Sequence, residues 1–192
     1  MTTAPRDTKR EILDTAEAML QERGFNAFSY QHIAERLGVK NAAVHYHFRS
    51  KADLGVAVIE RYRRRFHRWA ERLNSEGPHD PWGRLEAYFQ IYFAFLHSGN
   101  RICPSGVLQA EFESIPEEMR EASRVLLEDL LGWLTVLLAD GRERGAFHFL
   151  GEPADQAMIL GSTLQGGLQI ARACGPERFE AAVEQLRRQL KA

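Results

Sequence analysis

The chain contains few cysteines and lacks long apolar runs. It has two cysteines among 192 residues, Cys103 and Cys174, too few for a disulfide framework, so both are expected to be free thiols in a reducing cytoplasm. No run of 18 apolar residues occurs, so we expect no helix that spans a membrane. The first ten residues lack the apolar core of a secretory signal. These absences predict a soluble, cytoplasmic protein with no membrane partner.

Strand patterns, repeats and catalytic motifs are also missing. The longest strand-like alternation, at residues 146–150, is short enough to be a linker. No catalytic triad order, metal-ligand spacing or phosphate-binding loop is found. His45 and His47 are two residues apart, and such side chains point apart on a helix, so no metal site is expected. The chain is therefore predicted to be all-α, not an enzyme, and without a cofactor.

Charge is unevenly divided along the chain. Residues 1–72 hold 14 Lys and Arg against 9 Asp and Glu, whereas residues 73–192 hold 11 against 17. A basic front and an acidic back favour a DNA-facing end followed by a regulatory body. Chance clustering around the basic run at residues 61–68, which is expected to be a solvated face, would give the same numbers.

Helical spacing, capping residues and glycine breaks predict roughly nine helices. Thr8 with Glu11 has the pattern of a capping box, and Ser29 and Ser50 are further caps. Asp80 caps the helix that Pro81 opens. The expected helices begin near Thr8, Ser29, Asn41, Lys51, Pro81, Pro104, Glu117, Pro153 and Pro176, with a break at residues 74–78.

Residues 29–51 carry the pattern of a helix-turn-helix, with the turn at Gly38. The second helix of such a pair fits the major groove of duplex DNA. Two sets of residues are therefore expected to contact double-stranded DNA. Those expected to face the bases are Asn41, Ala42, Ala43, His45, Tyr46 and His47, and those expected to contact the backbone are Ser29, Tyr30, Gln31, Lys40 and Lys51.

This segment resembles a known family. Residues 8–62 are similar to the DNA-binding domain of the TetR family of transcriptional regulators in the turn at Gly38, the aromatic cluster at residues 44–48 and the pair Ser50 and Lys51. The resemblance covers the first third of the chain. It implies a DNA-binding domain at residues 1–50 that continues into a fourth helix from about 51, and a ligand-binding and dimerisation domain at residues 51–192.

The resemblance also implies a function. Members of this family are one-component regulators, most often repressors, that bind a palindromic operator as a homodimer and are released by a small molecule. Two residues depart from the pattern. Lys40 replaces the usual Ser or Thr cap, a loss of about 1 kcal/mol, so either Asn41 caps one position later or Lys40 contacts a phosphate. His45 replaces a common tyrosine, which could alter the operator sequence.

A small-molecule pocket is expected between the helices of the second domain. Its candidate lining residues are Tyr88, Tyr92, Cys103, Phe112, Trp133, Met158 and Gln165. Aromatic stripes at this spacing usually belong to an ordinary core, and the family resemblance is what favours a pocket. Gln165, a polar residue among apolar neighbours, could instead lie across a dimer seam.

Cys103 supports an alternative function, a thiol-based sensor of electrophiles or oxidants. It precedes Pro104 at an expected helix start and lies near Arg101, and both features favour a thiolate. The contrasting interpretation is an inert, buried thiol.

The last two expected helices carry an apolar stripe with small residues that permit close helix approach. In the TetR family these helices meet their symmetry mates as a four-helix bundle, and packing within one chain is the alternative. The predicted dimer interface consists of Gly161, Leu164, Leu168, Ala171, Phe179, Val183, Leu186 and Leu190.

Overall fold

The computed structural model describes residues 7–99 and 101–191, and within these ranges it contains nine α-helices and no strand. The all-α prediction is therefore confirmed. The helices are α1 (Thr8–Arg23), α2 (Tyr30–Leu37), α3 (Asn41–His47), α4 (Lys51–Glu76), α5 (Pro81–His97), α6 (Pro104–Ala110), α7 (Glu117–Glu143), α8 (Pro153–Cys174) and α9 (Glu177–Lys191). Residues 1–6 of the predicted DNA-binding domain lie outside the described ranges.

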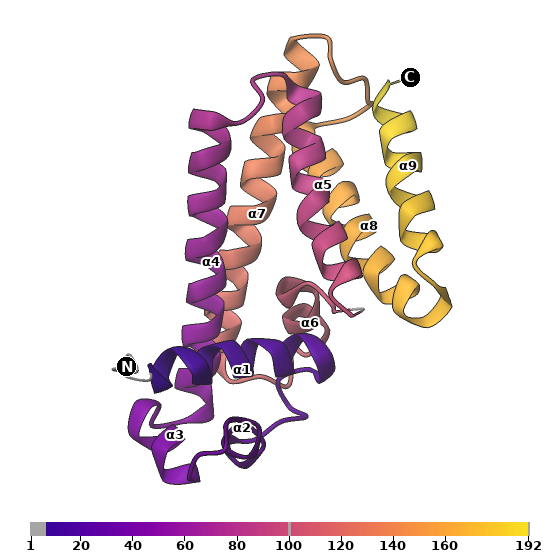
Figure 1. Ribbon diagram of the computed structural model, residues 1–192. Coiled ribbons are helices and arrows are strands. Elements are labelled where there is room, and N and C mark those ends of the chain that lie inside the picture. The colour runs from indigo at the N-terminus through magenta and orange to yellow at the C-terminus, as the bar shows by residue number, and fades with distance from the viewer. Residues whose placement is uncertain (1–6, 100, 192) are drawn as a thin grey trace, which may run out of the picture.

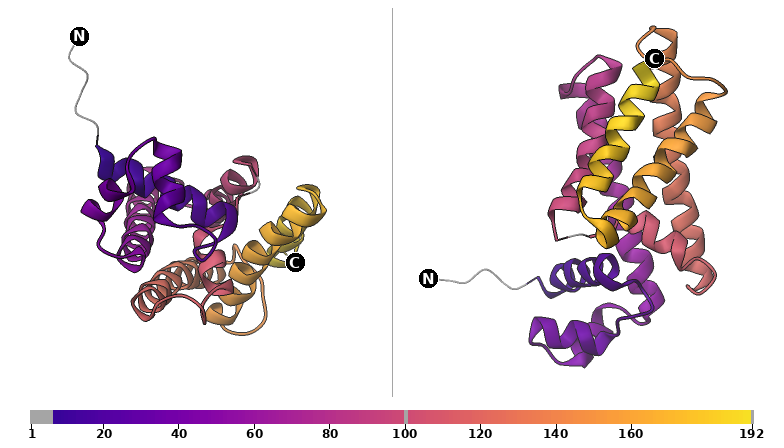
Figure 2. Two further views of the ribbon diagram at one scale, coloured as in Figure 1. Left: turned by 90° about the horizontal axis from the view of Figure 1, so that it is seen from below. Right: turned by 90° about the vertical axis from the view of Figure 1, so that its right-hand side faces the viewer.

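The helices form two groups (Figure 1). Helices α1, α2 and α3 lie together at one end of the molecule, and α4 leads from them into the group formed by α5 to α9. We call residues 7–50 the head and the described residues from 51 onward the body. The two further views show the same division (Figure 2). Among the described residues, no helix is long and apolar enough to cross a membrane.

Side-chain caps begin several of these helices where the sequence predicts them. Ser29 caps α2, and the Nδ1 atom of His32 accepts a hydrogen bond from the Ser29 amide at 3.1 Å, so the two residues form a capping box. Ser50 and Asp53 form another at the start of α4. Asp80 caps α5 directly before Pro81. Each cap satisfies amide groups that have no partner within their own helix.

Two predicted helix boundaries are wrong. The cap of α1 is Asp7, whose carboxylate accepts from the amide of Arg10, and Thr8 is already helical. Helix α4 continues to Glu76, three residues into the predicted break at residues 74–78, so the break begins only at Gly77. The Ser75 hydroxyl donates back to the carbonyl of Glu71, and Leu73 stays buried, so the last turn remains helical despite its polar sequence.

Helix α7 is the centre of the body. It packs against α4, α5, α6 and α8, whereas α9 packs on α8. Helix α9 also reaches α5, because the Arg187 guanidinium donates to both carboxylate oxygens of Glu86 at 2.6 and 2.7 Å. The Phe179 ring meets the Phe93 ring edge to face.

The predicted dimer stripe is buried within a single chain, and this contradicts its assignment as an interface. Its apolar side chains are at most 3% exposed, and Gly161 packs against Leu131 of α7. Small residues in α8 do permit close helix approach, but the approaching helices belong to the same chain. The buried members are Gly161, Leu164, Leu168, Ala171, Phe179, Val183, Leu186 and Leu190.

The end of α7 depends on a close contact at Gly141. The amides of Ala146 and Phe147 both donate to the Gly141 carbonyl, which folds the Phe147 ring back onto the helix. A Cβ atom at Gly141 would overlap that ring.

We predict that Gly141→Ala lowers the free energy of unfolding by about 1–3 kcal/mol, because the buried Phe147 ring must move. Gly132 lies in the same helix with open space around its Cα, so Gly132→Ala should raise stability by about 0.5–1 kcal/mol. Urea unfolding followed by circular dichroism measures both. A destabilising effect of equal size in both variants would contradict the packing argument.

Candidate functional site

Helices α2 and α3 form the predicted helix-turn-helix, and the turn between them requires glycine. Gly38 has φ 65° and ψ 34°, a left-handed conformation in which a Cβ is disfavoured. The Val39 amide donates to the Ala34 carbonyl at 3.0 Å and closes the turn. Ile33 and Val44 then pack into the core with no exposed surface, which fixes the angle between the two helices.

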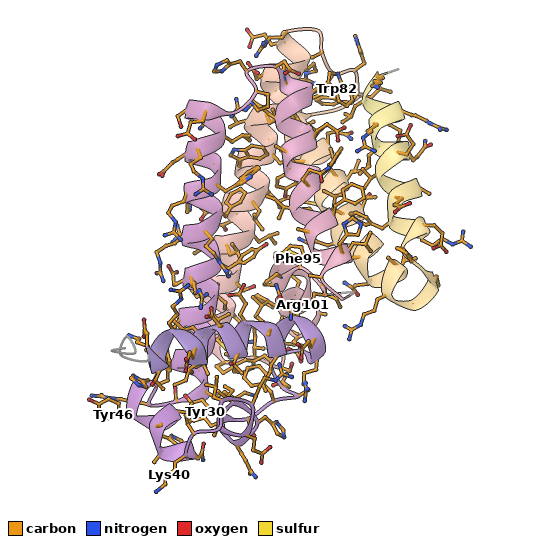
Figure 3. The ribbon with its side chains drawn as sticks, viewed as in Figure 1. Tyr30, Lys40, Tyr46, Trp82, Phe95 and Arg101 are labelled. Carbon is orange, nitrogen blue, oxygen red and sulfur yellow. The ribbon has the colours of Figure 1, made fainter. Side chains whose placement is uncertain are left out.

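The opposite face of α3 is open to solvent. Asn41, Ala42, His45 and Tyr46 are exposed there, while Ala43 and His47 are half-buried. The Tyr46 side chain is 85% exposed and its ring meets the His47 ring at 5.1 Å. Figure 3 shows Lys40 at the end of the head farthest from the body and Tyr46 projecting outward from the side of the head.

Lys40 occupies the N-cap position of α3 without a side-chain cap hydrogen bond. Asn41 is already helical, so the proposed shift of the cap to Asn41 is wrong. The Lys40 side chain is exposed, and no described carboxylate pairs with it. Its ammonium group is therefore available to a partner outside the protein.

Four other residues were predicted to contact the DNA backbone. In the structure two of them, Ser29 and Gln31, lie at the surface of the head, whereas Tyr30 and Lys51 face inward. Ser29 and Gln31 lie at the start of α2, where Gln31 is exposed. The Tyr30 hydroxyl instead donates within the head, to the Phe48 and Ser50 carbonyls. Burial, followed by the nearby Asp53 carboxylate, raises the pKa of Tyr30 to about 12. Its predicted phosphate contact does not fit this internal position.

Lys51 likewise faces inward. Its Nζ atom donates to the Phe25 carbonyl at 2.6 Å and lies 4.2 and 4.7 Å from the ring centres of Phe25 and Phe28. Burial lowers the pKa of Lys51, and the Glu111 carboxylate partly opposes this shift. Lys51 therefore braces the loop after α1, and the predicted phosphate contact does not fit this position.

The same loop is held by the body. The Glu111 carboxylate accepts from the amides of Phe25 and Asn26 at 2.6 and 3.3 Å. Arg172 of α8 donates to the Glu22 carbonyl at 2.6 Å. These contacts bind the C-terminal end of α1 to the end of α6 and to α8. These contacts between the head and the body could not be predicted from the sequence, because single polar residues such as Glu111 form no recognisable motif.

Further ion pairs join the head to α4, so the basic run at residues 61–68 is not a simple solvated face. Arg61 pairs with Asp14, and Arg65 pairs with Glu17, both carboxylates being on α1. Arg63 turns the other way and pairs with Asp129 of α7.

The Arg63 pair also sets the charge state of Asp129. Burial alone would raise the pKa of Asp129, but hydrogen bonds from Arg63 and His67 outweigh burial and lower it.

Four of the predicted pocket residues come together in the body. The Tyr88 ring stacks on Trp133 with 5.2 Å between ring centres, and its hydroxyl lies 3.3 Å from that of Tyr92. Cys103 lies near them, with its Sγ atom 3.8 Å from the hydroxyl of Tyr62. Burial raises the pKa of all three tyrosines, so their hydroxyls are neutral donors.

The other three predicted pocket residues lie elsewhere. Phe112 lies under the Arg124 guanidinium, outside this aromatic group. Met158 is 58% exposed on α8, so its assignment to the pocket is wrong. Gln165 is half-buried and donates weakly, at 3.5 Å, to the buried Ser105 hydroxyl.

An apolar cleft of about 280 Å³ opens beside the aromatic group, between α4 and α5. The sequence analysis missed these residues. It treated the run at residues 61–68 as a basic surface because of its arginines, although Tyr62, Phe66 and Trp69 recur there at helical spacing. The cleft is lined by Glu17, Tyr62, Arg65, Phe66, Trp69, Ile91, Ala94 and Phe95.

Of the two interpretations of Cys103, the structure supports the inert, buried thiol and not the thiolate. The side chain is 1% exposed, and burial raises the pKa of the thiol more than the hydrogen bonds from Tyr62 and from the Ser105 and Gly106 amides lower it. Arg101, the expected cation, pairs with Glu22 instead. The buried, protonated thiol matches the inert interpretation, and a thiol sensor is not favoured. Among the residues that the structure describes, no three His, Cys, Asp or Glu side chains form a possible metal site.

Comparisons with known proteins agree with this geometry. Residues 12–58 match the sequence model of the family described as "Bacterial regulatory proteins, tetR family". The chain is 29% identical over 183 residues to the HTH-type transcriptional repressor NemR of Escherichia coli, covering 88% of each chain. A TetR-family regulator from Agrobacterium tumefaciens superposes with a TM-score of 0.91 at 28% identity, over 98% of this chain and 100% of that one. A TetR regulator from Legionella pneumophila gives 0.87 at 28%, with the same coverage.

We predict that Lys51→Met lowers the free energy of unfolding by about 2 kcal/mol, because it removes a charge-assisted hydrogen bond and two cation–π contacts. Lys40→Met is the matched control, since the exposed Lys40 has no described partner and its loss should change stability by less than about 0.5 kcal/mol. Urea titration gives both values. Equal stabilities of the two variants would show that Lys51 is not a brace.

Proposed function

The chain belongs to the TetR family of transcriptional regulators, and from that premise we propose that it is a repressor which binds a palindromic operator as a homodimer and leaves it when a small molecule binds the body. The single observation that carries the proposal is the exposed face of α3. Its polar and aromatic side chains have solvent in front of them, while its apolar residue Val44 is buried behind. We assign this action to the cytoplasm, where the DNA is.

The exposed face of α3 suits readout of base edges in the major groove. Asn41 and His45 offer hydrogen-bonding groups, and Ala42 and Ala43 are small enough to approach a thymine methyl group. Tyr46 and His47 complete this surface, and Ser29, Gln31 and Lys40 at its margin suit contacts with the DNA backbone. Residues 1–50 would thus form the DNA-reading unit, which continues into α4.

A homodimer would place two such heads on one duplex, roughly 34–36 Å apart as successive major grooves require. The free face of α8 supports the choice of interface. Ile159 and Ile170 are 53% and 55% exposed and, being eleven residues apart, share the side of that helix opposite its buried stripe, while Met158 is 58% exposed at the flank of that side. We therefore move the proposed interface from the buried stripe to this face, where a second copy would cover apolar surface.

Release would follow from the joint between head and body. The loop after α1 is bound to α6 by Glu111 and to α8 by Arg172. A ligand that binds more tightly to a body in which these helices have shifted would favour heads at the wrong separation for the operator. No contact between ligand and DNA is needed.

Selection of bound duplexes from a random DNA pool tests the DNA-reading proposal. We expect enrichment of a two-fold symmetric sequence. With that duplex, Tyr46→Ala should weaken binding by about 1–3 kcal/mol if the ring contacts a base. Lys40→Met should weaken binding to every sequence and lower the salt slope by about one. A folded, dimeric protein that enriches no sequence, even after unfolding and refolding to remove bound ligand, would contradict the proposal.

Substitution on α8 tests the proposed interface. Ile159→Lys should convert the dimer to a monomer, measured by sedimentation, and weaken operator binding at least ten-fold, because a charge would be buried without a partner. Leu150→Lys is the matched control: Leu150 is 97% exposed outside α8, and its variant should remain dimeric. If the Ile159 variant stays dimeric, the interface lies elsewhere.

A further inference from the structure

The cleft lies between α4 and α5 because both helices pack against α7 and hardly contact each other. In Figure 1, α7 is seen between α4 and α5, and α1 crosses the lower end of α4. The cleft volume of about 280 Å³ lies at the lower end of the range for small-molecule sites. A ligand of one or two rings is the size that fits.

The apolar wall of the cleft is aromatic. Phe66 and Trp69 stack on α4 with 5.6 Å between ring centres. Tyr62 and Phe95 face each other from the two helices, with ring centres 6.4 Å apart. Figure 3 labels Phe95 on α5, at the end nearer to α1. Such walls bind a flat, apolar ring through offset or edge contacts.

The two charged residues that line the cleft, Glu17 and Arg65, form an ion pair. Arg65 of α4 holds the carboxylate of Glu17 of α1 through its Nη2 atom, while its Nε atom is buried with no hydrogen-bond partner. Nε and Nη2 lie on the same edge of a guanidinium group, the edge that binds a carboxylate through two parallel hydrogen bonds. Glu17 therefore satisfies only half of the binding edge of Arg65.

Glu17 also has a second possible partner. Its other carboxylate oxygen lies 3.9 Å from Nε of Arg61, whose Nη1 atom is buried without a hydrogen-bond partner. If another anion took Arg65, the Glu17 carboxylate could turn to Arg61 without becoming a buried, unpaired charge. The two guanidinium groups could therefore pair with one further anion in addition to Glu17.

We propose that this cleft binds a small aromatic carboxylate, whose ring packs on Phe66, Trp69 and Phe95 and whose carboxylate displaces Glu17 from Arg65. This inference rests on the proposed function, because it names the effector class of that regulator. Glu17 belongs to the head and Arg65 to the body, so displacement breaks one of the links between α1 and α4. Binding of the carboxylate and binding of the operator then oppose each other by the same factor.

The test uses 1-naphthoate and its neutral counterpart 1-naphthamide, titrated by calorimetry into the full chain without DNA. We expect naphthoate to bind at least ten-fold more tightly than naphthamide. Arg65→Gln should remove this preference. Arg64→Gln is the matched control, because Arg64 neighbours Arg65 but is 60% exposed and does not line the cleft, and its variant should keep the preference.

Glu17→Gln is a second variant that distinguishes a specific effect of Arg65→Gln from a loss of binding caused by misfolding. This variant removes the competing carboxylate, so naphthoate should bind several-fold more tightly than to the unmodified chain, while naphthamide should be unaffected. A gain in affinity cannot arise from a damaged fold. Equal affinities for the acid and the amide, no binding of either, or a preference that survives Arg65→Gln would each overturn the proposal.

The operator experiment separates this proposal from the general one. If naphthoate binding depends on Arg65 but the protein enriches no DNA sequence, the proposed anion site is supported and the proposed regulator is contradicted. An enriched operator without naphthoate binding would leave the regulator and overturn the anion site. If both hold, naphthoate should weaken operator binding, and Arg65→Gln should abolish that effect while Arg64→Gln keeps it.

Discussion

The attachment of the head to the body rests on the peptide groups where α1 ends. Carbonyls in the last turn of a helix, and amides in the loop that follows, need partners from outside that helix. Here Lys51 takes one loop carbonyl, Glu111 takes two loop amides and Arg172 takes a carbonyl of the last turn. These side chains come from α4, the end of α6 and α8, so movement of any of these elements acts on the head.

The body is arranged so that such movement is possible. Because α4 and α5 both pack on α7, an open cleft lined by side chains separates them. Tyr62 and its neighbours make the inner wall of that space, and the Glu17–Arg65 pair joins its edge to α1. The cleft therefore lies between the aromatic core and the joint, and a molecule bound there meets both.

Local features were predictable because they depend on neighbours in sequence. The caps at Ser29, Ser50 and Asp80 and the turn at Gly38 involve hydrogen bonds or backbone angles within a few residues. Features that depend on distant partners were not. Cys103 has the helix start and the nearby arginine that favour a thiolate, yet burial and the pairing of Arg101 with Glu22 reverse the outcome.

The sequence by itself determined the number and type of the helices, the caps of α2, α4 and α5, the helix-turn-helix and the family, because periodicity and turn chemistry depend on residues close together in the chain. Only the tertiary structure decided which faces are covered. Helical spacing marks the stripe of α8 and α9 as apolar, but it cannot say whether the covering helix comes from the same chain or from a second copy. It also could not show that arginines along α4 face carboxylates of α1, since ion pairs across 48 residues of sequence depend on how the helices pack.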